Sequence, residues 1–345
     1  MKNAFWNDLT AMIDGKKLDY QPVGFIIDSP WIPGWYGTSN IDFYASDEVW
    51  LKSNLKAINT FPDAWFLPSF WSEYGMCTEP SAFGSRMVFL EKSLPHAERI
   101  LSGIEAVDSL PQPNVKTDGL LPFMISRLRN NQEAILKADH QIRFAVARGP
   151  LNIASFLMGT TEFMMALAMD PEGSHKLLKK ITDFVCDWVA WQKECFPSID
   201  GVLILDDIIG FVGEVEFEEF VLPYFKRIFE SANLKVRFLH NDAEGLITAG
   251  YLKKMGVNMF NFSFNHTMGE IRELAGPEVV LVGNIPPRDV LAAGTPEQVD
   301  AAVAKAFGEI NNHDGIIWSV GGGMPPDVKN VNIEAFINAV KKYSK

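Results

Sequence analysis

The second half of the chain alternates short apolar runs with longer segments whose apolar residues recur every three to four positions. The runs VLIL, VVLV and GIIW are wholly apolar apart from one glycine, which is typical of parallel strands buried on both faces. The longer segments have the spacing of helices. The pattern therefore predicts strands at 142–149, 201–206, 235–240, 257–263, 279–283 and 315–320, and helices within 151–169, 170–196, 216–233, 242–255, 267–275, 296–311 and 331–343.

Strand-then-helix alternation implies parallel strands joined by right-handed crossovers. The first 140 residues are less regular, with candidate strands at 22–28 and 64–68 and a hairpin around 85–92. Adding two of these strands makes eight. We expect a single (β/α)8 TIM barrel over 1–345, with an irregular N-terminal elaboration in 1–140. A doubly wound open sheet is the alternative.

Composition narrows the class of partner. Lys and Arg number 31 and Asp and Glu 43, a net charge of −12, so we expect no nucleic-acid partner. The three cysteines, an odd number, favour a reducing compartment over a disulfide framework. No charge-free apolar run approaches about 18 residues, and the N-terminus lacks the apolar core of a signal peptide. We therefore expect a soluble cytoplasmic protein with no membrane partner.

A barrel places its functional groups at the carboxyl ends of its strands. Asp206 and Asp207 end one predicted strand, and His240 and Asp242 end the next. His240 and Asp242, with Asp207 as third ligand, would leave one position open, the pattern of a catalytic zinc site. Asp206, Asp207 and His240 are the catalytic candidates, and Glu219 is a second-rank metal ligand. In the alternative, the two aspartates cap a helix or loop and His240 is an ordinary core histidine.

Other strand ends also carry polar residues: Asp28, Arg148 and Asn284, the last a candidate for substrate contact. Aromatic residues are concentrated in 30–37 and 68–84. From these segments Trp31, Trp71, Glu73 and Tyr74 are candidates for holding a flat ring by stacking or polar contact. Ordinary packing of a long irregular segment is the alternative. Gly321–Gly323 either permits close approach of a ligand or forms a plain turn.

The motifs GPLNIASFLMG, GVLILDDIIGF, FLHNDAEG and VGNIPPRDV, in this order and spacing, resemble the uroporphyrinogen decarboxylase superfamily over about 145–345. The resemblance implies a (β/α)8 barrel. True decarboxylases of this superfamily have an N-terminal motif similar to R-Q-A-G-R-Y that binds the substrate's carboxylates. The corresponding FIIDSPWIPGWYG has no arginine, and an eight-carboxylate porphyrinogen needs guanidinium partners. The resemblance therefore favours the corrinoid-dependent methyltransferase branch.

Members of that branch that act on coenzyme M hold zinc through an H-x-C motif and a distal cysteine. Here His240 matches the histidine, Asp242 stands in place of the motif's cysteine, and the distal position falls in Gly321–Gly323. A carboxylate in place of thiolates would make the ion harder, which suits an ether oxygen better than a thiol.

The N-terminal half is similar to members associated with demethylation of methoxylated aromatics. The resemblance thus implies methyl transfer from a methoxylated, aromatic donor to cob(I)alamin on a separate corrinoid-binding protein. A quaternary amine donor stays open, as does the oligomeric state, although relatives are often homodimers. A non-catalytic barrel that docks a corrinoid carrier and a decarboxylase of a small acid are the other two hypotheses.

Overall fold

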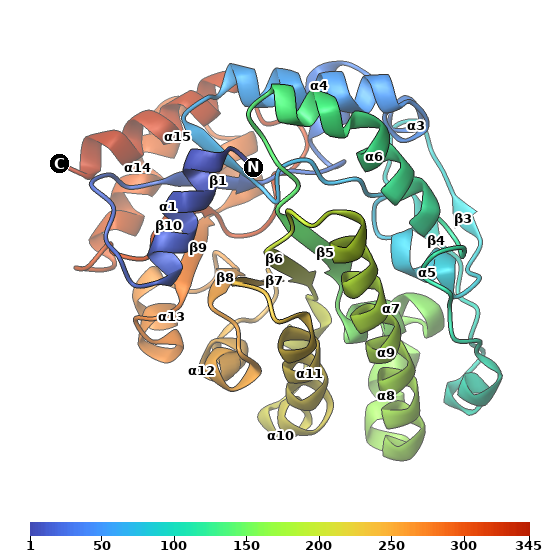
Figure 1. Ribbon diagram of the computed structural model, residues 1–345. Helices are drawn as coiled ribbons and strands as arrows, with labels where there is room; N and C mark the ends of the chain where they lie inside the picture. The colour runs from blue at the N-terminus through green and yellow to red at the C-terminus, as the bar shows by residue number, and fades with distance from the viewer.

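A computed structural model describes all residues, 1–345. Eight parallel strands form one curled sheet surrounded by helices, a TIM-barrel-like α/β fold (Figure 1). Successive strands of the sheet are neighbours except at one gap, between the second and the third, and the first also pairs with the last, so the order has no reversal of the doubly wound kind. The strands are β1 (Val23–Ile26), β2 (Ala64–Leu67), β5 (Phe144–Arg148), β6 (Gly201–Leu205), β7 (Val236–Asn241), β8 (Met259–Phe262), β9 (Val280–Ile285) and β10 (Ile316–Val320).

The order along the sheet is β2-β1-β10-β9-β8-β7-β6-β5, so β2 and β5 are its two edges. All eight predicted strands are present, with ends shifted by a few residues. The predicted hairpin is also present but short, and it pairs β3 (Met87–Val88) with β4 (His96–Ala97) in antiparallel fashion.

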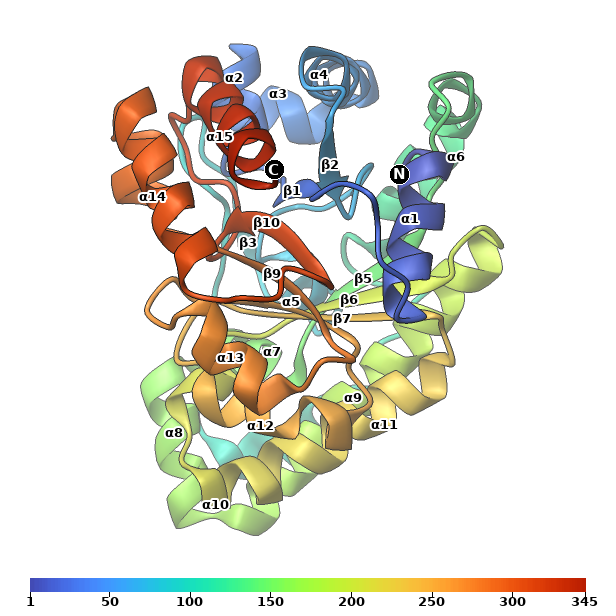
Figure 2. The same cartoon turned by 90° about the vertical axis from the view of Figure 1, so that its left-hand side faces the viewer.

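The strands divide their side chains between two cores. Residues such as Val146, Leu203 and Phe238 point into the barrel and form an inner cluster, whereas their strand neighbours pack outward against the helices. Helix α1 (Asn3–Ile13), which the sequence pattern did not predict, crosses one end of the barrel and adds Trp6 and Leu9 to the inner cluster (Figures 1 and 2). The inner core therefore closes the amino-terminal end of the barrel.

The outer helices follow the prediction most closely after β5. The apolar stretch 151–169 is broken at Gly159, whose φ is +104°, and the two resulting helices are bent by 110°. No single helix is long and apolar enough to cross a membrane; these two pass that test only as a bent pair. The helices are α7 (Pro150–Met158), α8 (Thr160–Met169), α9 (Pro171–Cys195), η2 (Ile208–Phe211), α10 (Glu214–Glu216), η3 (Phe217–Val221), α11 (Leu222–Ala232), α12 (Leu246–Met255), α13 (Met268–Ala275), η4 (Pro287–Ala292), α14 (Pro296–Gly308) and α15 (Asn330–Tyr343).

The segment 1–140 is more helical than the sequence pattern indicated. Besides α1, its helices are α2 (Ile32–Tyr36), α3 (Asn40–Ala45), α4 (Asp47–Thr60), α5 (Thr78–Ala82), η1 (Ile104–Ser109) and α6 (Leu121–Lys137). Helices α4 and α6 pack against each other along one side of the barrel (Figure 1), whereas η1 packs against α9.

Candidate active site

On each strand, every second side chain points into the barrel, and this alternation continues past the carboxyl end of the strand. In β7, Phe238 points into the barrel, and His240 follows two residues later on the same face. In β6, Leu205 points inward, and Asp207 continues that row. Strand geometry thus brings His240 and Asp207 to the mouth of the barrel from neighbouring strands, as the sequence predicted.

A cavity of about 860 Å³ opens at this mouth. It is lined mainly by polar residues, and none of its lining residues is a Phe, Tyr or Trp. Six of its titratable side chains come from four strand ends and one helix: Asp28, Arg148, Asp207, His240, Asp242 and Arg288.

The imidazole of His240 is held in one orientation by Asn261. The amide Nδ2 of Asn261 donates to the carbonyl oxygens of Val282 (2.8 Å) and Val320 (3.2 Å). Its Oδ1 therefore faces Nδ1 of His240 at 2.7 Å and accepts a hydrogen bond from the Nδ1–H group. In the neutral imidazole, the lone pair is then on Nε2.

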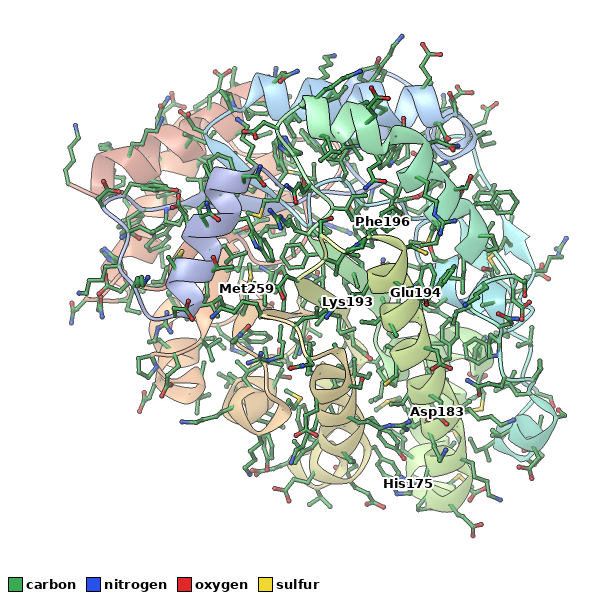
Figure 3. All side chains as sticks on the ribbon, viewed as in Figure 1. His175, Asp183, Lys193, Glu194, Phe196 and Met259 are labelled. Atoms are coloured by element: carbon green, nitrogen blue, oxygen red, sulfur yellow. The ribbon has the colours of Figure 1, made fainter.

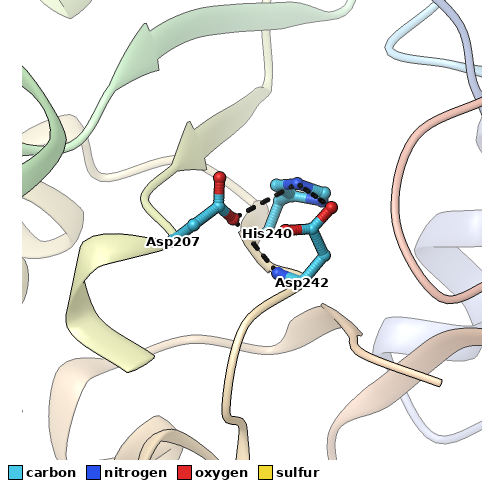
Figure 4. Close-up of side chains that lie close together, drawn as sticks. All are labelled: Asp207, His240 and Asp242. Carbon is cyan, nitrogen blue, oxygen red and sulfur yellow. Dashed lines mark hydrogen bonds and ion pairs between the residues drawn. The ribbon is translucent and has the colours of Figure 1, made fainter. Parts of the chain in front are cut away.

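That lone pair points toward two carboxylates (Figure 4). Nε2 of His240 lies 3.6 Å from Oδ1 of Asp207 and 4.0 Å from Oδ2 of Asp242. The backbone N–H of Asp242 donates to the same Oδ1 at 3.1 Å, which keeps the two acids together. Burial raises the pKa of Asp242, and Asp207 raises it further while His240 opposes the shift. Three electron-pair donors thus face one another around one point.

This arrangement fits a metal ion. One ligand atom from each of Asp207, His240 and Asp242 lies within 4.8 Å of the others. Ligands at about 2.1 Å in a tetrahedron are about 3.4 Å apart, so a small contraction would suffice. One nitrogen and two oxygens are a donor set that zinc accepts, and it is harder than a thiolate set. The hydrogen bond from Nδ1 to Asn261 is the outer contact that ligating histidines usually make.

Gly322 makes room for this cluster. Its φ is +132°, a conformation that favours glycine, and a Cβ there would lie 2.9 Å from Oδ2 of Asp242. The group that approaches Gly321–Gly323 closely is therefore the carboxyl of Asp242.

Replacement of Asn261 by alanine tests the orientation of His240. We expect zinc affinity to fall about 10- to 100-fold, because outer contacts of ligating histidines usually contribute that much. The measurement is zinc titration against a competing chelator. Asn265→Ala is the control, since Asn265 is exposed and four residues away; equal effects in both variants would remove Asn261 from the site.

The structure corrects the catalytic role expected for Asp206. Asp206 is adjacent to Asp207 and therefore points to the opposite face of the sheet. It is fully buried and points away from the cavity toward α7. Its carboxyl accepts the backbone N–H groups of Leu151 (2.9 Å), Asn152 (3.0 Å) and Ile208 (3.1 Å). Burial raises its pKa to about 8, against the effect of these bonds. Asp206 therefore anchors the start of α7 to the end of β6, as the capping alternative stated.

Glu219 does not belong to the metal-binding group either. It lies on η3, and its Oε1 is 3.4 Å from Nε2 of His175. Figure 3 places His175 at the outer end of α9, away from the strands. The pair joins two helices at the surface.

The aromatic candidates lie outside the cavity lining. Trp31 stacks on Trp35, with ring centroids 4.9 Å apart, and its Nε1 donates to the carbonyl oxygen of Val328. The Tyr74 hydroxyl accepts from Arg127 at 3.3 Å, and Trp71 packs against the inner core. Ordinary packing, the alternative stated for these residues, accounts for all three.

Two polar candidates also have other partners. Glu73 is buried and accepts the backbone N–H groups of Ser29 and Gly75. Asn284 donates to the carbonyl oxygen of His266 and so ties the end of β9 to the loop after β8. Neither lines the cavity.

Asp28, Arg148 and Arg288 do line the cavity; the sequence placed the first two at strand ends but assigned no role to any of the three. Asp28 and Arg148 continue the inward rows of β1 and β5, and Arg288 lies on η4. Burial, with Glu73, raises the pKa of Asp28 to about 8, while Arg148 opposes the shift. The alternation along each strand was the signal that could have identified the first two.

A barrel with a polar cavity at the carboxyl ends of its strands, and three side chains within it that could hold a metal ion, is typical of TIM-barrel enzymes. A family model described as uroporphyrinogen decarboxylase (URO-D) matches residues 9–343. The chain belongs to this family, which confirms the resemblance seen in the sequence and extends it over the N-terminal half.

Two curated relatives are distant from this chain and share one name. A uroporphyrinogen decarboxylase from Pseudomonas syringae pv. syringae is 24% identical over 279 residues, covering 77% of this chain and 76% of that protein. The enzyme of the same name from Dichelobacter nodosus is 24% identical over 311 residues, covering 88% and 86%.

Two solved structures share the fold. A methyltransferase from Methanosarcina mazei superposes with a TM-score of 0.82 at 18% identity, covering 98% of each chain. A B12-independent methionine synthase from Shewanella sp. W3-18-1 gives a TM-score of 0.57 at 12% identity, covering 94% of this chain and 97% of that one.

Proposed function

We propose that this protein is a zinc-dependent methyltransferase, which moves a methyl group from a methoxylated donor to cob(I)alamin carried by a separate corrinoid-binding protein. The observation that carries the proposal is the Nε2 lone pair of His240, which faces Asp207 and Asp242 at the base of an open cavity. The similarity in fold to a methyltransferase is consistent with it.

The chain's own groups have defined roles in this scheme. His240, Asp207 and Asp242 would hold the zinc ion, and Asn261 keeps Nε2 of His240 directed toward it. When bound, zinc would supply a Lewis acid that polarises the ether oxygen of the donor. The nucleophile comes from the corrinoid, so no protein nucleophile is required. In this scheme the donor binds in the open cavity, and the corrinoid approaches it from the mouth of the barrel.

The cavity is a poor match for a porphyrinogen with eight carboxylates. It contains two arginines, Arg148 and Arg288, among several acidic side chains. The segment 25–37, which begins within β1 and continues into the loop after it, contains no arginine. The charges of the cavity therefore favour a substrate with fewer carboxylates than a porphyrinogen has.

A turnover assay tests the proposal. The zinc-loaded protein is mixed with reduced corrinoid protein and a panel of methoxylated compounds, and release of the demethylated alcohol or phenol is measured by chromatography. We expect release that requires both the corrinoid and the donor. Reactions without protein and with His240→Ala are the controls.

The same assay separates the other hypotheses. Binding of the corrinoid protein with no release from any donor would support a docking barrel and contradict the proposal. Carbon dioxide release from a small acid without corrinoid would indicate a decarboxylase instead.

A further inference from the structure

Arg148 is a largely buried residue whose guanidinium opens to the cavity and has no hydrogen-bond or ion-pair partner within the protein. It ends β5 on the inward face, lines the cavity and is only 7% exposed. Its side chain makes no hydrogen bond and no ion pair within 4.0 Å; the contact it has is with the ring of Trp71, at 6.0 Å. Buried charges in proteins are normally paired, because an unpaired charge is costly to desolvate.

The acids around Arg148 are engaged elsewhere. Glu73 accepts two backbone N–H groups, and Glu79 accepts the backbone N–H of Arg148 itself at 3.0 Å. Burial raises the pKa of both glutamates. Asp242 is within electrostatic range of Arg148 but belongs to the His240 cluster.

Asp28 completes the surroundings of Arg148. It lines the same cavity, and its Oδ1 is buried without a hydrogen-bond partner. Burial, with Glu73, raises the pKa of Asp28. No ion pair within 4.0 Å joins Asp28 to Arg148, so the guanidinium stays available to a ligand in the cavity.

We infer that Arg148 binds an anionic group, a carboxylate, on the methyl donor. This inference rests on the proposed function and adds the chemical class of the donor. A guanidinium recognises a carboxylate through two parallel N–H donors. The carboxylate would lie at Arg148 while the methoxy group lies near His240, since both residues line one cavity. A quaternary ammonium donor, left open by the sequence, would be repelled there.

Matched pairs of ligands test the inference on the wild-type protein. Binding of 3-methoxybenzoate and methoxyacetate is compared with that of their uncharged amides by calorimetry. In at least one pair, we expect the acid to bind about 10- to 100-fold more tightly, the usual effect of charge-assisted hydrogen bonds. Equal binding of acid and amide in both pairs would overturn the inference.

Variants then assign the preference to a residue. Arg148→Gln is expected to reduce the acid's affinity to within about threefold of the amide's, while Arg148→Lys retains part of the preference. Arg288→Gln is the matched control, since Arg288 lines the same cavity. Loss of the preference in Arg288→Gln with retention in Arg148→Gln would contradict the assignment. Thermal unfolding checks that each variant folds, and the lysine variant and the wild-type ligand pairs remain decisive if the glutamine variant does not.

The outcomes separate this inference from the proposed function. A preference for acids without any methyl transfer would leave the anion site standing and reject the methyltransferase. If the protein transfers methyl groups but binds each acid and its amide equally well, the methyltransferase stands and the anion site is rejected.

Discussion

Replacement of Asp206 by alanine is expected to destabilise the folded protein by about 3 kcal/mol or more. The carboxyl accepts three backbone N–H groups, two of them from the first turn of α7. Each buried donor left without an acceptor costs about 1–3 kcal/mol. Gly149 lets the carboxyl approach, because a Cβ at that position would collide with Oδ2 of Asp206. The measurement is the free energy of unfolding from denaturant titration.

The neighbouring residue provides a matched control. Asp207→Ala removes a partly exposed carboxylate that accepts one backbone N–H, from Asp242. We expect it to change the free energy of unfolding by less than about 1 kcal/mol, but to impair zinc binding. Asp206→Asn keeps one acceptor oxygen and should recover part of the stability. A stable Asp206→Ala variant that has lost activity would restore the catalytic role that the structure argues against.

Replacement of His240 by alanine is expected to abolish stoichiometric zinc binding and to lower methyl transfer by at least about 10³-fold. It removes the one nitrogen ligand of the group. A Lewis acid contributes several kcal/mol to stabilisation of the transition state, and each 1.36 kcal/mol is tenfold in rate. Elemental analysis of the purified protein measures the first effect, and the turnover assay measures the second.

His175→Ala is the control for this experiment. His175 pairs with Glu219 at the surface, and we expect its replacement to leave both zinc content and turnover unchanged. Full zinc content in the His240→Ala variant would reject the proposed metal site. It would support the alternative in which His240 is a core histidine held by Asn261.

The parts of the fold that the sequence predicted best are those with the simplest pattern. The parallel strands are buried on both faces and are therefore mainly apolar, so all eight were recognised. The helices α1, α4 and α6 were missed. Their apolar faces match surfaces created only by folding, such as the end of the barrel that receives Trp6 and Leu9 of α1.

The candidate site was predicted in part for the same reason. Placement at strand ends identified Asp207, His240 and Asp242, which the structure brings together. The aromatic segments were misleading, because residues such as Trp31 satisfy their own packing needs away from the cavity. The composition of these loops does not show where the aromatic side chains point, because their orientation depends on contacts with distant segments.

The sequence by itself determined the barrel and its family, and its strand ends indicated the three residues that the structure brings together. It also contained the alternation that separates Asp206 from Asp207, since adjacent strand residues point to opposite faces. Only the tertiary structure decided that Arg148 is buried without a counter-ion, that Glu219 lies elsewhere, and that the cavity is polar. Backbone geometry decides to which face of the sheet each side chain of a strand points. The partners of that side chain depend on how distant segments pack around it.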